Sequence, residues 1–363
     1  MKNVTMISRR SFLKAAMAAS AVSALAFTGC GGSASSTVAA SSTASSAAAE
    51  GGQTFKVGIV NYVDHASLNQ IVESVESRLD ELGAEKGVTF DYADYYANAQ
   101  ADQSNLNQIG ADLVGDGVDV IVAVANPTPT AATMLAAVED TDIPVVYSAV
   151  TDPAAAGFDG EENITGTSDA LNTEAIMNLI TAVNPDIDTI GLLYDLSQDA
   201  STQAIADAKA FCDANGIKYI EKNGTTTAEV QMAAEALIAA GVKAVFTPTD
   251  NTVMTAELSI YETFTEADVQ HYTGADSFAL NGAFVGYGVD YVQLGEATAD
   301  MVAELLCEGK TTADLPYQTF DNGIVTINTE TCEALGLDLD TVKEAFKPYC
   351  TEIVEVTTAE NFS

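Results

Sequence analysis

The chain has 363 residues, of which 47% are hydrophobic and 18% are charged, so it is long enough to bury the cores of two ordinary globular domains. This composition excludes an intrinsically disordered protein. The formal net charge of −38 also makes nucleic acid and anionic membrane surfaces poor partners, because a strongly acidic body repels both.

The first thirty residues have the pattern of a bacterial export signal. Arg9 and Arg10 lie in the run SRRSFLK, which is typical of twin-arginine export. The alanine-rich apolar stretch that follows, 15–27, is too short to span a bilayer as a permanent helix. The segment then ends in FTGC, which resembles a lipobox with phenylalanine where leucine is usual. We therefore expect residues 1–30 to be a lipoprotein export signal in which Cys30 is the lipidation site.

Residues 31–53 are rich in serine, alanine and glycine, a composition typical of a flexible tether. Together with a lipid on Cys30, this tether predicts an exported protein that is anchored to the outer face of the bacterial cytoplasmic membrane. We call residues 31–363 the body of the protein, and we expect it to be monomeric.

From residue 54 onward, short β-branched strands alternate with segments that have the apolar spacing of helices. This alternation predicts right-handed βαβ crossovers and parallel sheets covered on both faces. A polar segment, 152–169, interrupts the alternation, which then restarts and so predicts an α/β protein with two doubly wound, Rossmann-like lobes. The predicted strands are 55–60, 89–95, 118–124, 145–149, 189–194, 219–221 and 244–246. The predicted helices are 68–82, 103–114, 128–138, 173–182, 201–215 and 228–239.

Polar residues gather where the predicted strands end, in both lobes. In open parallel sheets, ligands bind beyond the carboxyl ends of strands, where helix N-termini expose unpaired N–H groups. Any one of these residues could instead simply cap its helix, but caps alone do not require so many polar strand ends. We therefore predict a ligand-binding site formed from Asp64, His65, Asn126, Thr128, Ser148, Thr151, Asp152, Tyr194, Asp250, Asn251, Thr252, Asp276 and Ser277.

The cysteines beyond Cys30 leave two alternatives open. Outside the cytoplasm, Cys212, Cys307, Cys332 and Cys350 could form two disulfides, among which a bond between the last two would close a short C-terminal loop. Free buried thiols are the equal alternative, and no CxxC spacing indicates a redox or zinc site.

Catalytic signals are weak. The chain has no HExxH, GxSxG or GxxxxGK[ST] motif, and no GxGxxG motif behind a strand. Its two histidines, His65 and His271, are far apart in sequence, and no EF-hand spacing occurs among the acids. We therefore predict a binding protein rather than an enzyme, without a cofactor or a metal site.

Several stretches resemble a known family, in the family's order. They include VGIVNYVDHASLN, VDVIVAVANPT, IPVVYSAVTDPAAAG, NITGTSD, FTPTDNTV and GYGVDYVQLGEATADM, and they cover roughly residues 55–310. On these residues the body resembles the substrate-binding lipoproteins of ABC transporters, in the group that contains tryptophan and tyrosine binders. The resemblance implies a type I periplasmic-binding-protein fold, whose two lobes are joined by a three-segment hinge and close over one ligand, and whose closed form is recognised by permease subunits.

The resemblance also implies how the chain is divided. We expect hinge crossings within 152–167, 276–286 and 309–315. The predicted first lobe is 54–155 with 290–312, the predicted second lobe is 156–289 with 313–350, and the predicted C-terminal tail is 351–363.

The scarcity of arginine constrains the ligand. Arg78 is the only arginine of the body and lies on a predicted helix well past a strand end, so a bidentate arginine clamp on an anionic ligand is not expected. Hydroxyls and N–H groups near Thr128, Thr151 or Thr252 would hold a carboxylate, and Asp250 or Asp276 would pair with an ammonium group. An amino acid, in particular an aromatic one, fits these constraints. The alternatives are a sugar or nucleoside in the same fold, or a ligand sensor that serves a membrane receptor.

Overall fold

The computed structural model describes residues 52–124, 128–320 and 323–362. The export signal, Cys30, most of the tether and Asn126 lie outside these ranges, so the predictions made for them stay predictions. Residues 51–363 form one compact unit. Within the described ranges, no helix is long and apolar enough to cross a membrane.

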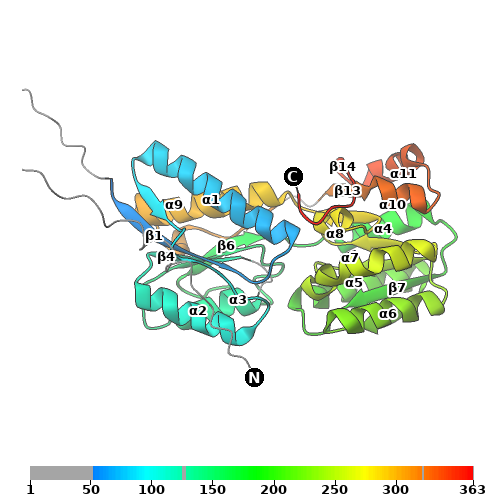
Figure 1. Ribbon diagram of the computed structural model, residues 1–363, viewed down its shortest axis with the longest axis horizontal. Coiled ribbons are helices and arrows are strands. Elements are labelled where there is room, and N and C mark those ends of the chain that lie inside the picture. The colour runs from blue at the N-terminus through cyan, green and yellow to red at the C-terminus, as the bar shows by residue number, and fades with distance from the viewer. Residues whose placement is uncertain (1–51, 125–127, 321–322, 363) are drawn as a thin grey trace, which may run out of the picture. The chain divides into compact units, whose positions relative to one another are not determined.

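The first lobe is built on a parallel sheet. Its strand order is β12-β6-β5-β4-β1-β2, and β3 also pairs with β1. The strands are β1 (Thr54–Asn61), β2 (Thr89–Asp91), β3 (Tyr96–Asn98), β4 (Val120–Val124), β5 (Val145–Ser148), β6 (Ile164–Ser168) and β12 (Gln318–Thr319). Figure 1 shows α1 and α9 on one face of this sheet, and α2 and α3 on the other. These helices are α1 (Ala66–Lys86), α2 (Gln103–Asp116), α3 (Thr128–Ala137) and α9 (Tyr291–Glu308).

The second lobe contains a mixed sheet in the order β14-β13-β11-β10-β9-β7-β8, in which only the pairing of β11 with β13 is antiparallel among the described residues. Its strands are β7 (Thr189–Tyr194), β8 (Lys218–Asn223), β9 (Ala244–Thr247), β10 (Gln270–Thr273), β11 (Val285–Gly288), β13 (Ile324–Asn328) and β14 (Glu352–Val356). Its helices are α4 (Thr173–Val183), α5 (Asp199–Asn215), α6 (Thr227–Ala239), α7 (Asn251–Glu266), α8 (Asp276–Leu280), α10 (Thr329–Ala334) and α11 (Leu339–Phe346).

Local signals in the sequence account for where many of these elements begin and end. The Asp102 carboxylate accepts a hydrogen bond from the Asn105 backbone N–H at 2.9 Å and so caps α2. The helix ends at Gly117, whose φ of 64° lies in the left-handed region that glycine adopts without strain. The prediction of two α/β lobes with mostly parallel sheets is confirmed.

The hinge crossings differ from the prediction. β6 pairs with β5, so the first sheet extends to Ser168 and the chain leaves it at residues 169–172, not within 152–167. β6 falls within the polar segment 152–169 because its small hydroxyl residues, Thr165, Thr167 and Ser168, lack the apolar pattern that predicts a buried strand.

The second and third crossings also lie further along the chain than expected. β11 belongs to the second sheet and α9 packs on α1, so the return to the first lobe is at 289–290 rather than 276–286. β12 pairs with β6, and β13 pairs with β11, which places the third crossing after Thr319 rather than within 309–315. The predicted C-terminal tail is likewise partly structured, because β14 pairs with β13 as the edge strand of the second sheet.

The four cysteines of the described body are all free thiols. Of the two alternatives that the sequence left open, the structure has the free thiols, and no disulfide joins Cys332 and Cys350. Cys332 Sγ instead contacts the Leu337 carbonyl oxygen at 3.7 Å, and Cys350 Sγ contacts that of Phe346 at 3.3 Å. Burial raises the pKa of the Cys212 and Cys332 thiols to about 11, which keeps both protonated at neutral pH.

We predict that the thiols of the body react in two classes. Cys212 and Cys332 are buried and protonated, so at pH 7.5 they will react with a thiol reagent such as Ellman's reagent only after the body is unfolded in guanidinium, whereas Cys307 and Cys350 are partly exposed. Dithiothreitol will leave the melting temperature unchanged. A melting temperature that falls with reductant, together with fewer than four titratable thiols in guanidinium, would contradict the free-thiol state.

Candidate functional site

A cavity lies where the two lobes meet. It encloses about 380 Å³ of space between atoms, including the part open to solvent. The first lobe and its hinge contribute the start of α1, the chain after β5 and β6, and the start of α9. The second lobe contributes the chain after β9, the start of α7 and the region of α8. The cavity therefore lies at the carboxyl ends of strands from both sheets, which is where ligands bind in open parallel sheets.

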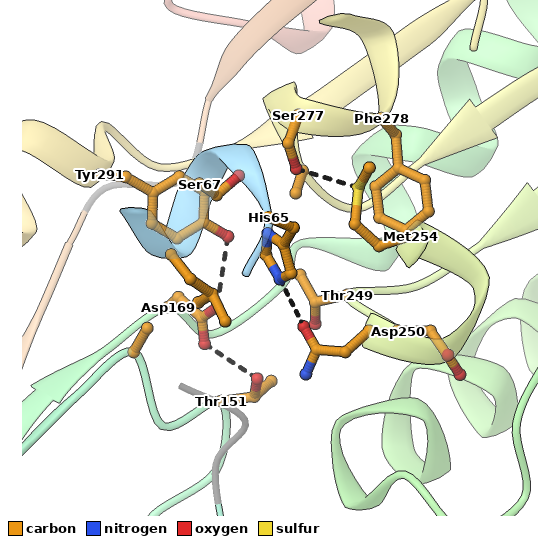
Figure 2. A pocket seen from close by; sticks show the side chains of 14 residues that line it. His65, Ser67, Thr151, Asp169, Thr249, Asp250, Met254, Ser277, Phe278 and Tyr291 are labelled. Atoms are coloured by element: carbon orange, nitrogen blue, oxygen red, sulfur yellow. Dashed lines mark hydrogen bonds between the residues drawn. The ribbon is translucent and has the colours of Figure 1, made fainter. Parts of the chain in front are cut away.

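One end of this cavity holds a buried carboxylate. Asp169 follows β6 and accepts a hydrogen bond from the Thr151 hydroxyl at 2.8 Å and from the Tyr291 hydroxyl at 3.3 Å (Figure 2). The Asp169 side chain is only 6% exposed, and this burial raises its pKa to about 6. No lysine or arginine occurs among the described residues that line the cavity. At neutral pH the site therefore contains a negative charge without a protein cation beside it.

The chain after β5 is shaped to bring Thr151 to this carboxylate. Ala149, which also lines the cavity, has a φ of 67°, a left-handed conformation that non-glycine residues rarely adopt. Such strain costs on the order of 1–3 kcal/mol and persists where the surrounding structure holds it, commonly at functional sites.

The middle of the cavity has a hydrogen bond between the lobes. His65, the N-cap of α1, and Asn251, the first residue of α7, are joined by a 2.7 Å contact between Nε2 and Oδ1. Burial lowers the pKa of His65 to about 4, so its imidazole is neutral at pH 7. Three buried polar atoms that line the cavity have no hydrogen-bond partner in the protein, namely His65 Nδ1, Asn251 Nδ2 and Thr249 Oγ1.

The other end of the cavity is mainly apolar. Met254 of α7 and Phe278 of α8 line it, and both are buried. The Ser277 hydroxyl lies 3.1 Å from Met254 Sδ and holds that flexible side chain in place (Figure 2). The cavity thus combines an acidic polar end with an apolar end, which suits a small amphipathic cation or zwitterion.

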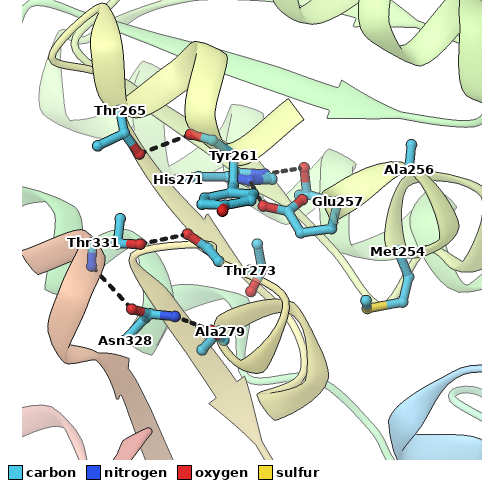
Figure 3. Close-up of polar contacts among 12 residues, drawn as sticks. Met254, Ala256, Glu257, Tyr261, Thr265, His271, Thr273, Ala279, Asn328 and Thr331 are labelled. Carbon is cyan, nitrogen blue, oxygen red and sulfur yellow. Dashed lines mark hydrogen bonds and ion pairs between the residues drawn. The ribbon is translucent and has the colours of Figure 1, made fainter. Parts of the chain in front are cut away.

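Behind the apolar end lies a buried histidine with a carboxylate partner. His271 Nδ1 is 3.0 Å from Glu257 Oε1 (Figure 3). His271 Nε2 is 2.8 Å from the Thr247 hydroxyl. The series of hydroxyl, imidazole and carboxylate is that of a nucleophilic triad, but all three residues are at most 2% exposed and none lines the cavity. Since the His271 ring packs edge-on against Phe278, with centroids 6.3 Å apart, the group supports the cavity wall. Within the described ranges, no cluster of three or more His, Cys, Asp or Glu could hold a metal ion.

The predicted site residues divide into two groups. Those that line the cavity are His65, Thr151, Asp250, Asn251 and Ser277. Asp250 is committed to the fold, because its carboxylate accepts bonds from the Val253 N–H at 3.0 Å, the Asp195 N–H at 2.7 Å and the Ser201 hydroxyl at 2.8 Å. It therefore acts as the cap of α7.

The remaining predicted residues make contacts elsewhere. Ser148 bonds the Thr298 hydroxyl, Asp64 accepts from Asn98, Asp152 accepts from the Ala155 N–H, Tyr194 donates to Glu221, Thr252 donates to Asp195, and Asp276 accepts from Ser67. The last of these contacts joins the two lobes at 2.9 Å. Thr128 begins α3, and its side chain, like all of Asn126, lies outside what the structure describes.

Sequence reasoning missed two central residues, Asp169 and Tyr291. Asp169 follows a strand, as the other candidates do, but β6 was not recognised as one. Tyr291 follows β11 and the cap residue Asp290, so the same rule applied to that strand would have found it.

Comparisons with known proteins identify the family. Residues 56–348 match the sequence model described as ABC transporter substrate binding protein. A tyrosine-binding protein from Clostridioides difficile is 28% identical over 288 residues, which are 77% of this chain and 81% of the relative.

Two solved structures are similar along their whole length. An ABC domain in complex with L-Trp from Streptococcus pneumoniae has 27% identity and a TM-score of 0.73, and covers 83% of this chain and 100% of its own. A conserved domain protein from Vibrio cholerae has 30% identity and a TM-score of 0.72, with the same coverage. Because the family model spans well over half of the chain, the protein belongs to the ABC transporter substrate-binding protein family.

Proposed function

We propose that the protein captures an aromatic amino acid between its two lobes and delivers it to the permease subunits of an ABC importer, while a lipid on Cys30 anchors it to the outer face of the membrane. The observation that carries this proposal is the buried Asp169 carboxylate, which faces a cavity lined by no described lysine or arginine. A buried charge requires a partner. The α-ammonium group of an amino acid supplies that partner and accounts for the acidic end of the site.

The α-carboxylate of the ligand would bind near the start of α1. The N-cap of this 21-residue helix, His65, makes no side-chain capping bond, so the first N–H groups of the helix keep their capacity to bind an anion. By contrast, α7 already has the Asp250 carboxylate as its cap. A helix start in place of an arginine is consistent with the single arginine of the body, Arg78, which pairs with Glu81 and Asp300 outside the cavity.

The ligand side chain would occupy the apolar end, against Met254 and Phe278. An aromatic ring suits this wall, because thioether and aromatic side chains both make favourable contacts with rings. The named ligands of the two relatives, tyrosine and L-Trp, support the same class.

Closure of the two lobes would couple binding to transport. The His65–Asn251 and Ser67–Asp276 hydrogen bonds join the lobes directly and form only when the lobes meet. A ligand that contacts both lobes favours this closed form, which the permease can then distinguish from the open one.

We predict that tyrosine or tryptophan will stabilise the body in a thermal-shift screen of the twenty amino acids, common sugars and nucleosides. At about 100 times its dissociation constant a ligand adds about 2.7 kcal/mol to the folded state, which raises the melting temperature by several degrees. Arabinose, adenosine and glutamate serve as negative controls. A shift with a sugar or nucleoside and none with amino acids would refute the assigned ligand class.

We predict opposite effects of Asp169→Asn on binding and on stability. The variant will lose most of its affinity for the amino acid, because the ammonium group loses its counter-charge. The same change will raise the melting temperature of the ligand-free body at pH 7 by a few degrees. It removes a buried carboxylate whose pKa is higher in the folded protein than in the unfolded chain, and which therefore destabilises the folded state when ionised.

Asp152→Asn is the matched control for this prediction, since Asp152 is exposed and caps a turn outside the cavity. Asp152→Asn should change neither the affinity for the amino acid nor the melting temperature of the ligand-free body. Unchanged ligand affinity in Asp169→Asn would refute the ammonium site.

We predict that affinity falls with pH below about 6. The pKa of Asp169 is about 6 in the ligand-free protein, so the carboxylate that binds the ammonium group becomes protonated as the pH falls. Titration calorimetry should show a nearly constant affinity between pH 8 and 7. Below about pH 6 the affinity should decrease with a slope that approaches about tenfold per pH unit. The residual binding of Asp169→Asn should lack this dependence. A wild-type affinity that stays constant from pH 8 to 5 would show that Asp169 does not bind the ammonium group.

A further inference from the structure

The hydrogen-bonded pair of His65 and Asn251 has two unused polar atoms. His65 Nε2 and Asn251 Oδ1 are joined at 2.7 Å, whereas His65 Nδ1 and Asn251 Nδ2 are buried and have no partner in the protein. Both residues line the cavity, and Asn251 is only 9% exposed. Figure 2 shows His65 between the Asp169 end of the cavity and the apolar wall.

The chemistry of this pair is independent of how its protons are arranged. If the imidazole proton is on Nε2, the ring donates to the amide oxygen, which leaves Nδ1 as an acceptor and the amide nitrogen as a donor. If the proton is on Nδ1, the amide must turn and donate to Nε2, which leaves a ring donor and an amide acceptor. In either arrangement the pair offers one donor and one acceptor to whatever occupies the cavity.

The pair lies beside the place that the ligand ring would occupy. Met254 is one turn of α7 after Asn251, and both line the cavity with Phe278. The Thr249 hydroxyl, a third buried group without a protein partner, lies on the segment just before α7. A ring held against Met254 and Phe278 would therefore have polar atoms of the second lobe at its edge.

We infer that His65 and Asn251 determine ligand specificity by pairing with a polar atom on the aromatic ring, so that the site accepts tyrosine and tryptophan and discriminates against phenylalanine. This inference rests on the proposed function. A phenol both donates and accepts, and an indole N–H donates, so each can pair with one of the free atoms whichever proton arrangement the pair adopts. A phenyl ring can neither donate nor accept a hydrogen bond, so it would leave the buried polar atoms of the pair unpaired. Sites built to bond a polar group discriminate most strongly against ligands that lack that group.

The wild-type body tests the inference without any substitution. Titration calorimetry at pH 7.5 would compare tyrosine, tryptophan and phenylalanine with 4-methylphenylalanine, which has nearly the shape of tyrosine but no hydrogen-bonding group on its ring. We expect tyrosine to bind at least about tenfold more tightly than phenylalanine and 4-methylphenylalanine. Affinities for tyrosine and 4-methylphenylalanine that agree within about twofold would overturn the inference.

Substitutions then assign the discrimination to the pair. In Asn251→Leu and in His65→Phe, the ratio of tyrosine to 4-methylphenylalanine affinity should fall toward one, whereas Tyr194→Phe should keep the wild-type ratio, because that hydroxyl bonds Glu221 away from the cavity. If the pair only closes the lobes, the substitutions will weaken all ligands equally and leave the ratio unchanged, which overturns the inference. Binding of none of the aromatic amino acids would instead refute the proposed function, and the inference with it.

Discussion

The buried carboxylate of Asp169 is the constraint on which the site depends. Its two hydrogen-bond donors, Thr151 and Tyr291, come from different parts of the chain, one after β5 and the other at the start of α9. Asp169 itself lies at the first hinge crossing. Asp169 is therefore at once a hinge residue, a residue of the cavity and a buried charge. A cationic group that binds it contacts the protein at the point where the lobes connect.

Among the described residues, burial raises the pKa of three aspartate side chains to about 6, and these three differ in their hydrogen-bond partners. Asp250 accepts three bonds from its own lobe and stabilises the start of α7. Asp276 accepts from Ser67 of the other lobe. Asp169 accepts from two hydroxyls and faces the cavity. Asp250 therefore stabilises the fold and Asp276 the contact between the lobes, whereas Asp169 is the residue that we assign to the ligand. Such a site lowers the stability of the ligand-free protein, a common consequence of building a binding site for a charged group.

The interface between the lobes combines apolar packing with a few directed bonds. One buried apolar cluster extends from the α1 and α9 face of the first lobe to the α6, α7 and α8 side of the second, and it includes Leu68, Met254 and Phe278. The neutral state of His65 fits this environment, because an uncharged imidazole avoids the cost of burying a cation beside apolar side chains. Specific recognition then depends on the few polar atoms that break the apolar surface.

The sequence by itself determined the class of this protein. Apolar periodicity and the spacing of turns predicted two α/β lobes, and polar strand ends predicted a site that includes His65, Thr151 and Asn251, because these signals are local and strands of a parallel sheet end at one edge. Tertiary structure alone decided which partners each polar side chain has. Asp250 and Asp169 both follow strands, are both acidic and both line the cavity, yet Asp250 accepts bonds from three donors of its own lobe whereas Asp169 accepts from two hydroxyls. That difference arises from partners 49 and 55 residues away for Asp250, and 18 and 122 residues away for Asp169, which no local pattern can reveal.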